Sequence, residues 1–152
     1  MKMIVPLAFV LAITVPQLRA QEHPEHPTGK TAASKAMSID DLEKGIKSAI
    51  AEKEKAGNGS YKLADKTAKK TWDLKLDHVH RERLSRLNEH TYFACTDFKS
   101  SDGHTVDVDF FMKEKGGKLV MSDATVHKVD EKARYNWEET KGGFWKKVPV
   151  KG

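Results

Sequence analysis

The sequence predicts an α+β fold in which one N-terminal amphipathic helix packs on a curved antiparallel sheet of about four to six strands. Three observations support this prediction. Apolar residues recur at helical spacing after Ser38, the apolar period changes to two from Trp72 onward, and Gly-containing turns separate the later apolar segments. Because short strands joined by tight turns pair antiparallel, the helix is expected to cover one face of the resulting sheet.

The helix is expected to begin after Ser38 and to end at Gly57-Asn58-Gly59. Ser38 with Asp41 three residues later is typical of a capping box in which Asp takes the place of Glu. The apolar positions of this segment form one stripe, which consists of Ile39, Leu42, Ile46, Ala49 and Ile50. A helix with a single apolar stripe buries that stripe against another element.

Alternating apolar and charged residues predict strands in the remainder of the chain. The clearest strands run from Trp72 to Leu76 and from Val106 to Met112. Further apolar segments, which follow the same reasoning, lie at 92–98, 119–129, 135–137 and 144–145. Turn signals separate them at Ser101-Asp102-Gly103, Gly116-Gly117 and Gly142-Gly143.

Three segments carry a resemblance to other proteins: Thr96-Asp97-Phe98-Lys99 through Asp109-Phe110-Phe111, then Thr125-Val126-His127-Lys128-Val129, and Arg134-Tyr135-Asn136-Trp137. They resemble small, uncharacterised exported bacterial proteins. The order of elements, a leading helix and then an antiparallel meander, also resembles the cystatin-like arrangement. That resemblance implies a fold and no activity, and the chain lacks a Gln-Val-type inhibitory hairpin, so protease inhibition does not follow.

Residues 1–20 are typical of a secretory signal peptide. Lys2 is followed by an apolar run from Ile4 to Val15, and Ala20 precedes the polar Gln21. The run is shorter than the roughly 20 residues that span a bilayer. We therefore expect a periplasmic or secreted protein that has no transmembrane segment after signal cleavage.

The rest of the chain is expected to divide into a disordered His/Pro leader, residues 21–37, and a single α+β domain, residues 38–152. The leader repeats Glu-His-Pro at 22–24 and 25–27 and has few apolar residues to bury. Its histidines, His23 and His26, sit beside glutamates, and a flexible tract of this kind can bind a divalent metal loosely.

The composition argues against several classes of function. The formal charge is +5, but basic and acidic residues are interspersed, so no nucleic-acid partner is expected. Cys95 is the single cysteine and no CxxC motif occurs, which argues against a thioredoxin-type redox pair and against c-type haem. An unpaired cysteine within a strand is expected to be buried.

Histidines are the candidate metal ligands. His78 and His80 are two residues apart in the strand that begins near Trp72, so they are expected to share a face with its apolar row. Two imidazoles can hold zinc or copper if a third ligand joins them. We predict His127 as the third ligand. His90 and His104 also lie near expected strand ends.

Two other groups are candidates for chemistry or binding. Asp107 and Asp109 share the strand face opposite Val106 and Val108, where they are expected to be exposed and solubilising, although paired carboxylates also occur in enzymes. Aromatic residues could line a ligand cavity, and the candidates for it are Trp137, Trp145 and Tyr92.

Together these patterns favour a small exported binding or accessory protein of the bacterial envelope. Its partner would be a small molecule, a metal ion or an envelope protein. One alternative is an enzyme of the cone-shaped cystatin-like group that uses His127 or His104 with an Asp as acid and base. The other is a structural envelope component that has no pocket.

Overall fold

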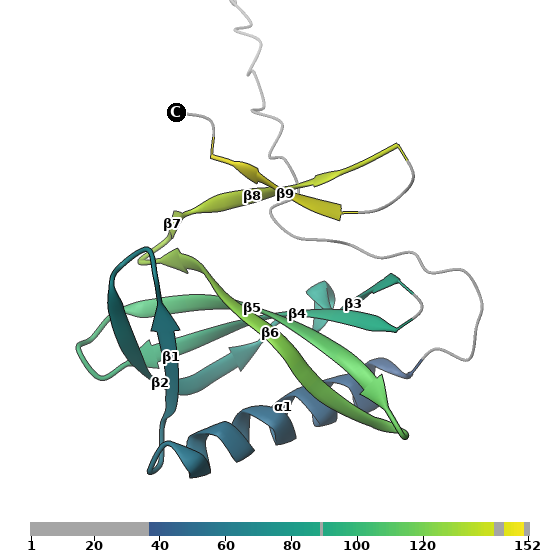
Figure 1. The fold of residues 1–152 in the computed structure, drawn as a ribbon, viewed down its shortest axis with the longest axis horizontal. Helices are drawn as coiled ribbons and strands as arrows, with labels where there is room; N and C mark the ends of the chain where they lie inside the picture. The colour runs from purple at the N-terminus through teal and green to yellow at the C-terminus, as the bar shows by residue number, and fades with distance from the viewer. Residues whose placement is uncertain (1–36, 89, 142–144, 151–152) are drawn as a thin grey trace, which may run out of the picture.

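The computed structural model describes residues 37–88, 90–141 and 145–150. It has three layers: a helix, a large curled antiparallel sheet, and a separate hairpin on the side of the sheet away from the helix (Figure 1). In chain order the elements are α1 (Ile39–Ala56), β1 (Tyr61–Asp65), β2 (Lys70–Val79), the 3-10 turn η1 (Arg81–Arg83), β3 (Ser85–Asn88), β4 (Thr91–Ser100), β5 (Thr105–Lys115), β6 (Lys118–Val129), β7 (Lys132–Ala133), β8 (Tyr135–Glu139) and β9 (Trp145–Pro149).

The predicted fold class, an α+β domain with a cystatin-like sheet of four to six strands, is wrong. Strands hold 58% and helix 19% of the described residues, so the protein is mostly β. The main sheet has seven strands in the order β1-β2-β4-β5-β6-β7, with β3 also paired to β4. The prediction missed β1 and β3, and it merged the last two strands with the sheet, whereas β8 and β9 pair only with each other.

Helix α1 forms with the predicted cap and buries most of the predicted apolar stripe, but Ile39, which the sequence pattern places in that stripe, is 52% exposed at the first turn. The Asp41 backbone N–H donates to Ser38 Oγ over 3.1 Å, and the Ser38 hydroxyl donates to the Asp41 carboxylate over 2.7 Å. Leu42, Ile46 and Ile50 are buried against the sheet. The helix approaches β6 so closely that a Cβ added at Gly45 would lie 2.7 Å from Leu119 Cδ1. Glycine at this position therefore allows the helix to contact the strand.

The sheet curls around the helix, so its first strand approaches β6. The Tyr61 hydroxyl of β1 lies 3.8 Å from the Met121 sulfur of β6, although the two strands are not paired. Strand alternation then separates the two faces. The face toward the helix carries the larger apolar core, which includes Leu74, Phe98, Val106, Val108 and Phe110, all with no solvent-exposed surface.

The β8–β9 hairpin lies over the opposite face of the sheet (Figure 1). A second, smaller core lies beneath it. Trp137 of β8 packs edge-on against Phe93 of β4, with ring centroids 5.4 Å apart, and lies 6.0 Å from Phe111 of β5. An ion pair of 2.8 Å between Arg134 and Asp65 ties the start of the hairpin to the end of β1. The hairpin therefore covers a sheet face that the sequence pattern assigned to solvent.

No helix in the described part of the chain is both long enough and apolar enough to cross a bilayer. The expected signal peptide, residues 1–20, lies outside the described residues. The same holds for the expected leader, residues 21–37, apart from Met37.

Replacing Ile46 by Ala tests the packing of α1 on the sheet. Ile46 is fully buried, so Ile46→Ala should lower the free energy of unfolding by about 2–5 kcal/mol, through lost apolar burial and a residual cavity. Ile39 lies on the same helix but is 52% exposed, so Ile39→Ala should change it by less than about 0.5 kcal/mol. Urea unfolding followed by circular dichroism measures both, and equal effects would contradict this packing.

Candidate functional site

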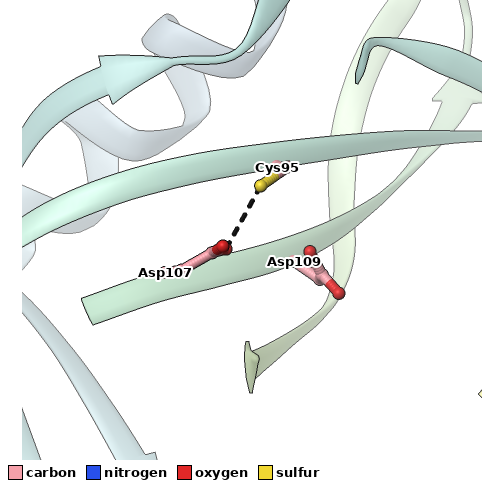
Figure 2. A group of neighbouring side chains, drawn as sticks. All are labelled: Cys95, Asp107 and Asp109. Carbon is pink, nitrogen blue, oxygen red and sulfur yellow. Dashed lines mark hydrogen bonds between the residues drawn. The ribbon is translucent and has the colours of Figure 1, made fainter. Parts of the chain in front are cut away.

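Cys95, Asp107 and Asp109 form a buried cluster between the sheet and the β8–β9 hairpin. Cys95 lies on β4, and the two aspartates lie on the adjacent strand β5 (Figure 2). The Cys95 thiol donates to Asp107 Oδ1 over 3.2 Å. One ligand-type atom from each residue lies within 4.8 Å of the others. We call this set the Cys95 cluster.

Strand alternation explains why these side chains meet. Cys95 pairs with Asp109 across the β4–β5 ladder, and residues two apart on a strand point to the same face, so Asp107 joins them. The sequence correctly predicts that the aspartates oppose Val106 and Val108. It wrongly predicts that they are exposed, because the hairpin leaves Asp109 with 0% and Asp107 with 6% of its surface accessible. The expected burial of Cys95 is confirmed.

Asp109 anchors the hairpin to the sheet. The Tyr135 hydroxyl donates to Asp109 Oδ2 over 2.6 Å, and the Trp137 indole N–H donates to the same oxygen over 3.0 Å. Burial raises the pKa of Asp109 to about 7, although both donors favour the charged form. The aromatic side chains of β8 are therefore held by a carboxyl group that titrates near neutral pH.

His127 extends the Cys95 cluster from β6. The pairing of β5 with β6 shifts between Asp107 and Val108, whose partners are Lys128 and Val126, and the extra residue is His127. Its ring is fully buried and stacks on Tyr135 with centroids 4.6 Å apart. The Nε2 atom lies 2.9 Å from the Tyr135 carbonyl oxygen, so Nε2 carries the proton that it donates.

The other ring nitrogen of His127 faces the carboxylates. Nδ1 lies 3.7 Å from Asp107 Oδ2 and 3.8 Å from Asp109 Oδ2. Because Nε2 donates to a carbonyl, Nδ1 of the neutral ring presents a lone pair toward these oxygens. A proton or a metal ion between His127, Asp107 and Asp109 would remove the repulsion between the nitrogen lone pair and the carboxylate oxygens.

Burial shifts the thiol and both carboxyl groups of the Cys95 cluster toward their protonated forms, because it raises the pKa of each. Burial raises the pKa of the Cys95 thiol, and the neighbouring Asp107 and Asp109 raise it further, although Arg83 Nη1 lies 3.6 Å from the sulfur. Burial also raises the pKa of Asp107 to about 6. Since a thiolate is the reactive form of cysteine, this environment argues against a nucleophilic role for Cys95.

A small polar pocket of about 120 Å³ lies beside the Cys95 cluster. Its lining residues come from η1 and the residue before it, from β4, β5 and β6, and from the turn that follows β6, and they include His80, Arg83, Asp97, Asp107, Lys128 and Glu131. Asp107 belongs to both the pocket and the cluster. It therefore connects the buried groups with this pocket.

The predicted metal ligands His78, His80 and His127 do not come together. The pairing of β2 with β4 shifts between Leu76 and His78, so Val79 enters the core in place of His78. His78 and His80 still contact each other, with ring centroids 4.8 Å apart. They therefore lie off the apolar face that the sequence assigns to them.

The partners of His80 are carboxylates. Its Nε2 lies 3.1 Å from Asp97 and its Nδ1 lies 3.2 Å from Glu82. Within residues 37–88, 90–141 and 145–150, the only three-residue group of closely spaced metal-ligand atoms is the Cys95 cluster. The cluster contains neither His78 nor His80, while His127 borders it.

The remaining candidates lie in three different places. His104 is at the surface, where its Nδ1 lies 2.6 Å from Asp130, while His90 is exposed on the turn before β4. Tyr92 is buried in the core on the helix side of the sheet, whereas Trp137 and the half-buried Trp145 belong to the core under the hairpin. The three proposed aromatic ligand contacts therefore do not line one cavity.

No family model, curated protein or solved structure matches this chain. Its function is therefore inferred from the geometry of the Cys95 cluster and the adjoining pocket.

Replacing Asp109 by Asn tests the buried carboxyl group. Its pKa is raised to about 7, so the native protein keeps a proton there that the unfolded chain releases above about pH 4. The free energy of unfolding should therefore fall as pH rises from about 4 to about 7. In Asp109→Asn this fall should be smaller, because Asn does not titrate and still accepts from Tyr135 and Trp137.

Urea unfolding at the two ends of this pH range measures the effect. Asp77→Asn is the matched control, because Asp77 is exposed on β2, and its pH dependence should follow that of the unmodified chain. A decline that stays equally steep in Asp109→Asn would show that Asp109 is not the titrating group.

Proposed function

We propose that this chain is a small exported binding protein of the bacterial envelope, and that it holds a divalent transition-metal ion in the Cys95 cluster. The observation that carries this proposal is the convergence of a thiol and two carboxyls within 4.8 Å at a buried position. Zinc takes such ligands, together with imidazole nitrogen, in a tetrahedral arrangement. His127 supplies the imidazole.

The spacing of the donor atoms supports this assignment. Bonds of about 2.0–2.3 Å in a tetrahedron place neighbouring ligand atoms roughly 3.3–3.8 Å apart. The Cys95 sulfur lies 3.2 Å from Asp107 Oδ1, while His127 Nδ1 lies 3.7 Å from Asp107 Oδ2 and 3.8 Å from Asp109 Oδ2. Because the donor atoms of the Cys95 cluster are spread over up to 4.8 Å and His127 lies at its border, the side chains would have to rotate and move closer by about 1 Å for four donors to meet one ion.

The charges also favour a divalent cation. A thiolate and two carboxylates carry three negative charges, and the Arg83 guanidinium near the Cys95 sulfur offsets one of them. A divalent ion balances the other two. Metal binding would displace the protons that the raised pKa values of Cys95, Asp107 and Asp109 retain, so affinity should increase with pH.

The burial of the Cys95 cluster favours metal binding over metal-dependent catalysis. A catalytic zinc site keeps one coordination position open to water or substrate, whereas a closed site has four protein ligands. Cys95, Asp109 and His127 have no exposed surface. We therefore infer a metal-binding or metal-delivering role.

The second candidate is an acid–base enzyme that uses His127 with Asp107 or Asp109. It is favoured by the buried His–carboxylate arrangement and by the pKa of Asp109, which is raised to about 7, a value suited to proton transfer. It requires a substrate to reach groups that lie beneath the hairpin. Metal binding requires only that a single ion reach the site beneath the hairpin.

Loading the metal-free full chain with zinc tests the proposed function. One zinc ion should bind per chain, as measured by native mass spectrometry and by competition with a chromophoric chelator. Cys95→Ser and Asp109→Asn should each weaken binding by at least about tenfold, because each removes a charged ligand. All variants should also carry His23→Ala and His26→Ala, which removes loose binding by the leader.

The matched control is the double variant His78→Ala/His80→Ala. It removes the imidazole pair that lies outside the Cys95 cluster, so it should bind zinc as tightly as the parent chain. Loss of binding in this control, with retention in Cys95→Ser, would place the metal on β2 and contradict the assignment.

A further inference from the structure

The pocket beside the Cys95 cluster is a built cavity with a distinct composition. Its volume of about 120 Å³ corresponds to roughly four water molecules at about 30 Å³ each. Ordinary pockets for organic ligands are larger, about 300–1,000 Å³, and are lined mainly by apolar groups. This pocket therefore suits a polar ligand of only a few non-hydrogen atoms.

Charged side chains of both signs line the pocket. Arg83 and Lys128 provide two basic side chains, and Asp97, Asp107 and Glu131 provide three carboxyl groups. Lys128 is 92% buried and stands opposite Asp107 in the β5–β6 ladder, so both belong to the inner wall. Asp97 is paired with His80, and Glu131 is exposed, so these residues form the outer wall.

Glu131 lies in the two-residue turn that joins β6 to β7, because Val129 pairs with Lys132. Asp130 and Glu131 both have positive φ values, 48° and 63°, as the favoured two-residue hairpin turn requires. Asp130 secures the turn by accepting the Thr105 backbone N–H over 3.0 Å. The hairpin thus places the Glu131 carboxylate at the pocket.

The lining favours a ligand that carries both signs over the simpler ligand classes. A lone cation would lie beside Arg83 and Lys128, a lone anion would lie beside three carboxyl groups, and an apolar molecule would displace water from charged walls. A ligand that carries both signs has a complementary group in each set. We propose that the pocket binds a small zwitterion with an ammonium and a carboxylate group, of the size of the simplest α-amino acids.

The positions of the charges give the ligand an orientation. Its carboxylate lies toward Arg83 and Lys128, where the planar guanidinium can donate two parallel hydrogen bonds. Its ammonium lies toward Asp97 and Glu131 at the outer wall. This site goes beyond the proposed metal site, and binding there requires no metal ion, although Asp107 and Arg83 border both.

Nuclear magnetic resonance of the ¹⁵N-labelled, metal-free full chain tests the proposal, with L-alanine as the probe. Saturable amide shifts are expected at Asp97, Lys128 and Glu131. Acetate and methylamine, which each carry half of the zwitterion, should not reach saturation over the same range. Glu131→Gln should raise the dissociation constant for L-alanine by about tenfold or more, because it removes a charged acceptor.

A control variant separates this site from general surface effects. Glu114→Gln changes an exposed glutamate at the far end of β5 and should leave binding unchanged. Because the titration uses the metal-free chain, it measures L-alanine binding independently of metal binding. No saturable shift with L-alanine, equal binding of acetate or of methylamine, or an unaffected Glu131→Gln variant would each overturn the proposal.

Discussion

The burial of Asp109 is the constraint on which the second half of this structure depends. Within the described residues, β8 and β9 share no strand pairing with the main sheet, so side-chain contacts hold the hairpin against it. Asp109 accepts hydrogen bonds from both Tyr135 and Trp137 and thereby ties the hairpin to the centre of β5. Burying a carboxyl group is costly unless it is hydrogen-bonded or paired. Here the hydrogen bonds that satisfy the Asp109 carboxyl also hold the β8–β9 hairpin in position.

The two faces of the sheet therefore have different physical characters. The face toward α1 is an ordinary apolar core, where Ile46, Phe98 and Phe110 have no exposed surface. The face toward the hairpin encloses a thiol, two carboxyls and an imidazole within a ring of aromatic side chains. Well-packed apolar residues at such positions are often as stabilising as buried charged groups, or more so, so a purely structural contact between sheet and hairpin does not require these polar groups. The retained polar groups are thus the strongest indication of a function on this face.

Local signals in the sequence predicted local structure well. The Ser38–Asp41 cap, the apolar stripe of α1 and the placement of Asp107 and Asp109 on one strand face all follow from short-range periodicity. Short-range periodicity does not predict how distant segments pack or where strand pairing shifts. A register shift after Leu76 turned His78 away from the core, and the coverage of Asp109 depended on a hairpin folding back from about 26 residues downstream. No short-range pattern records which face such a hairpin covers.

Absorption spectroscopy of the cobalt(II)-loaded chain tests the central claim, that a buried thiolate and carboxylates hold a metal ion together, most directly. Cobalt(II) takes the place of zinc in tetrahedral sites, and a thiolate ligand gives it a charge-transfer band in the near ultraviolet. We expect that band in the parent chain, with the intense visible bands of tetrahedral geometry, and its loss in Cys95→Ser. Cobalt bound without the charge-transfer band, or a band that survives in Cys95→Ser, would show that the ion lies elsewhere and would contradict this account.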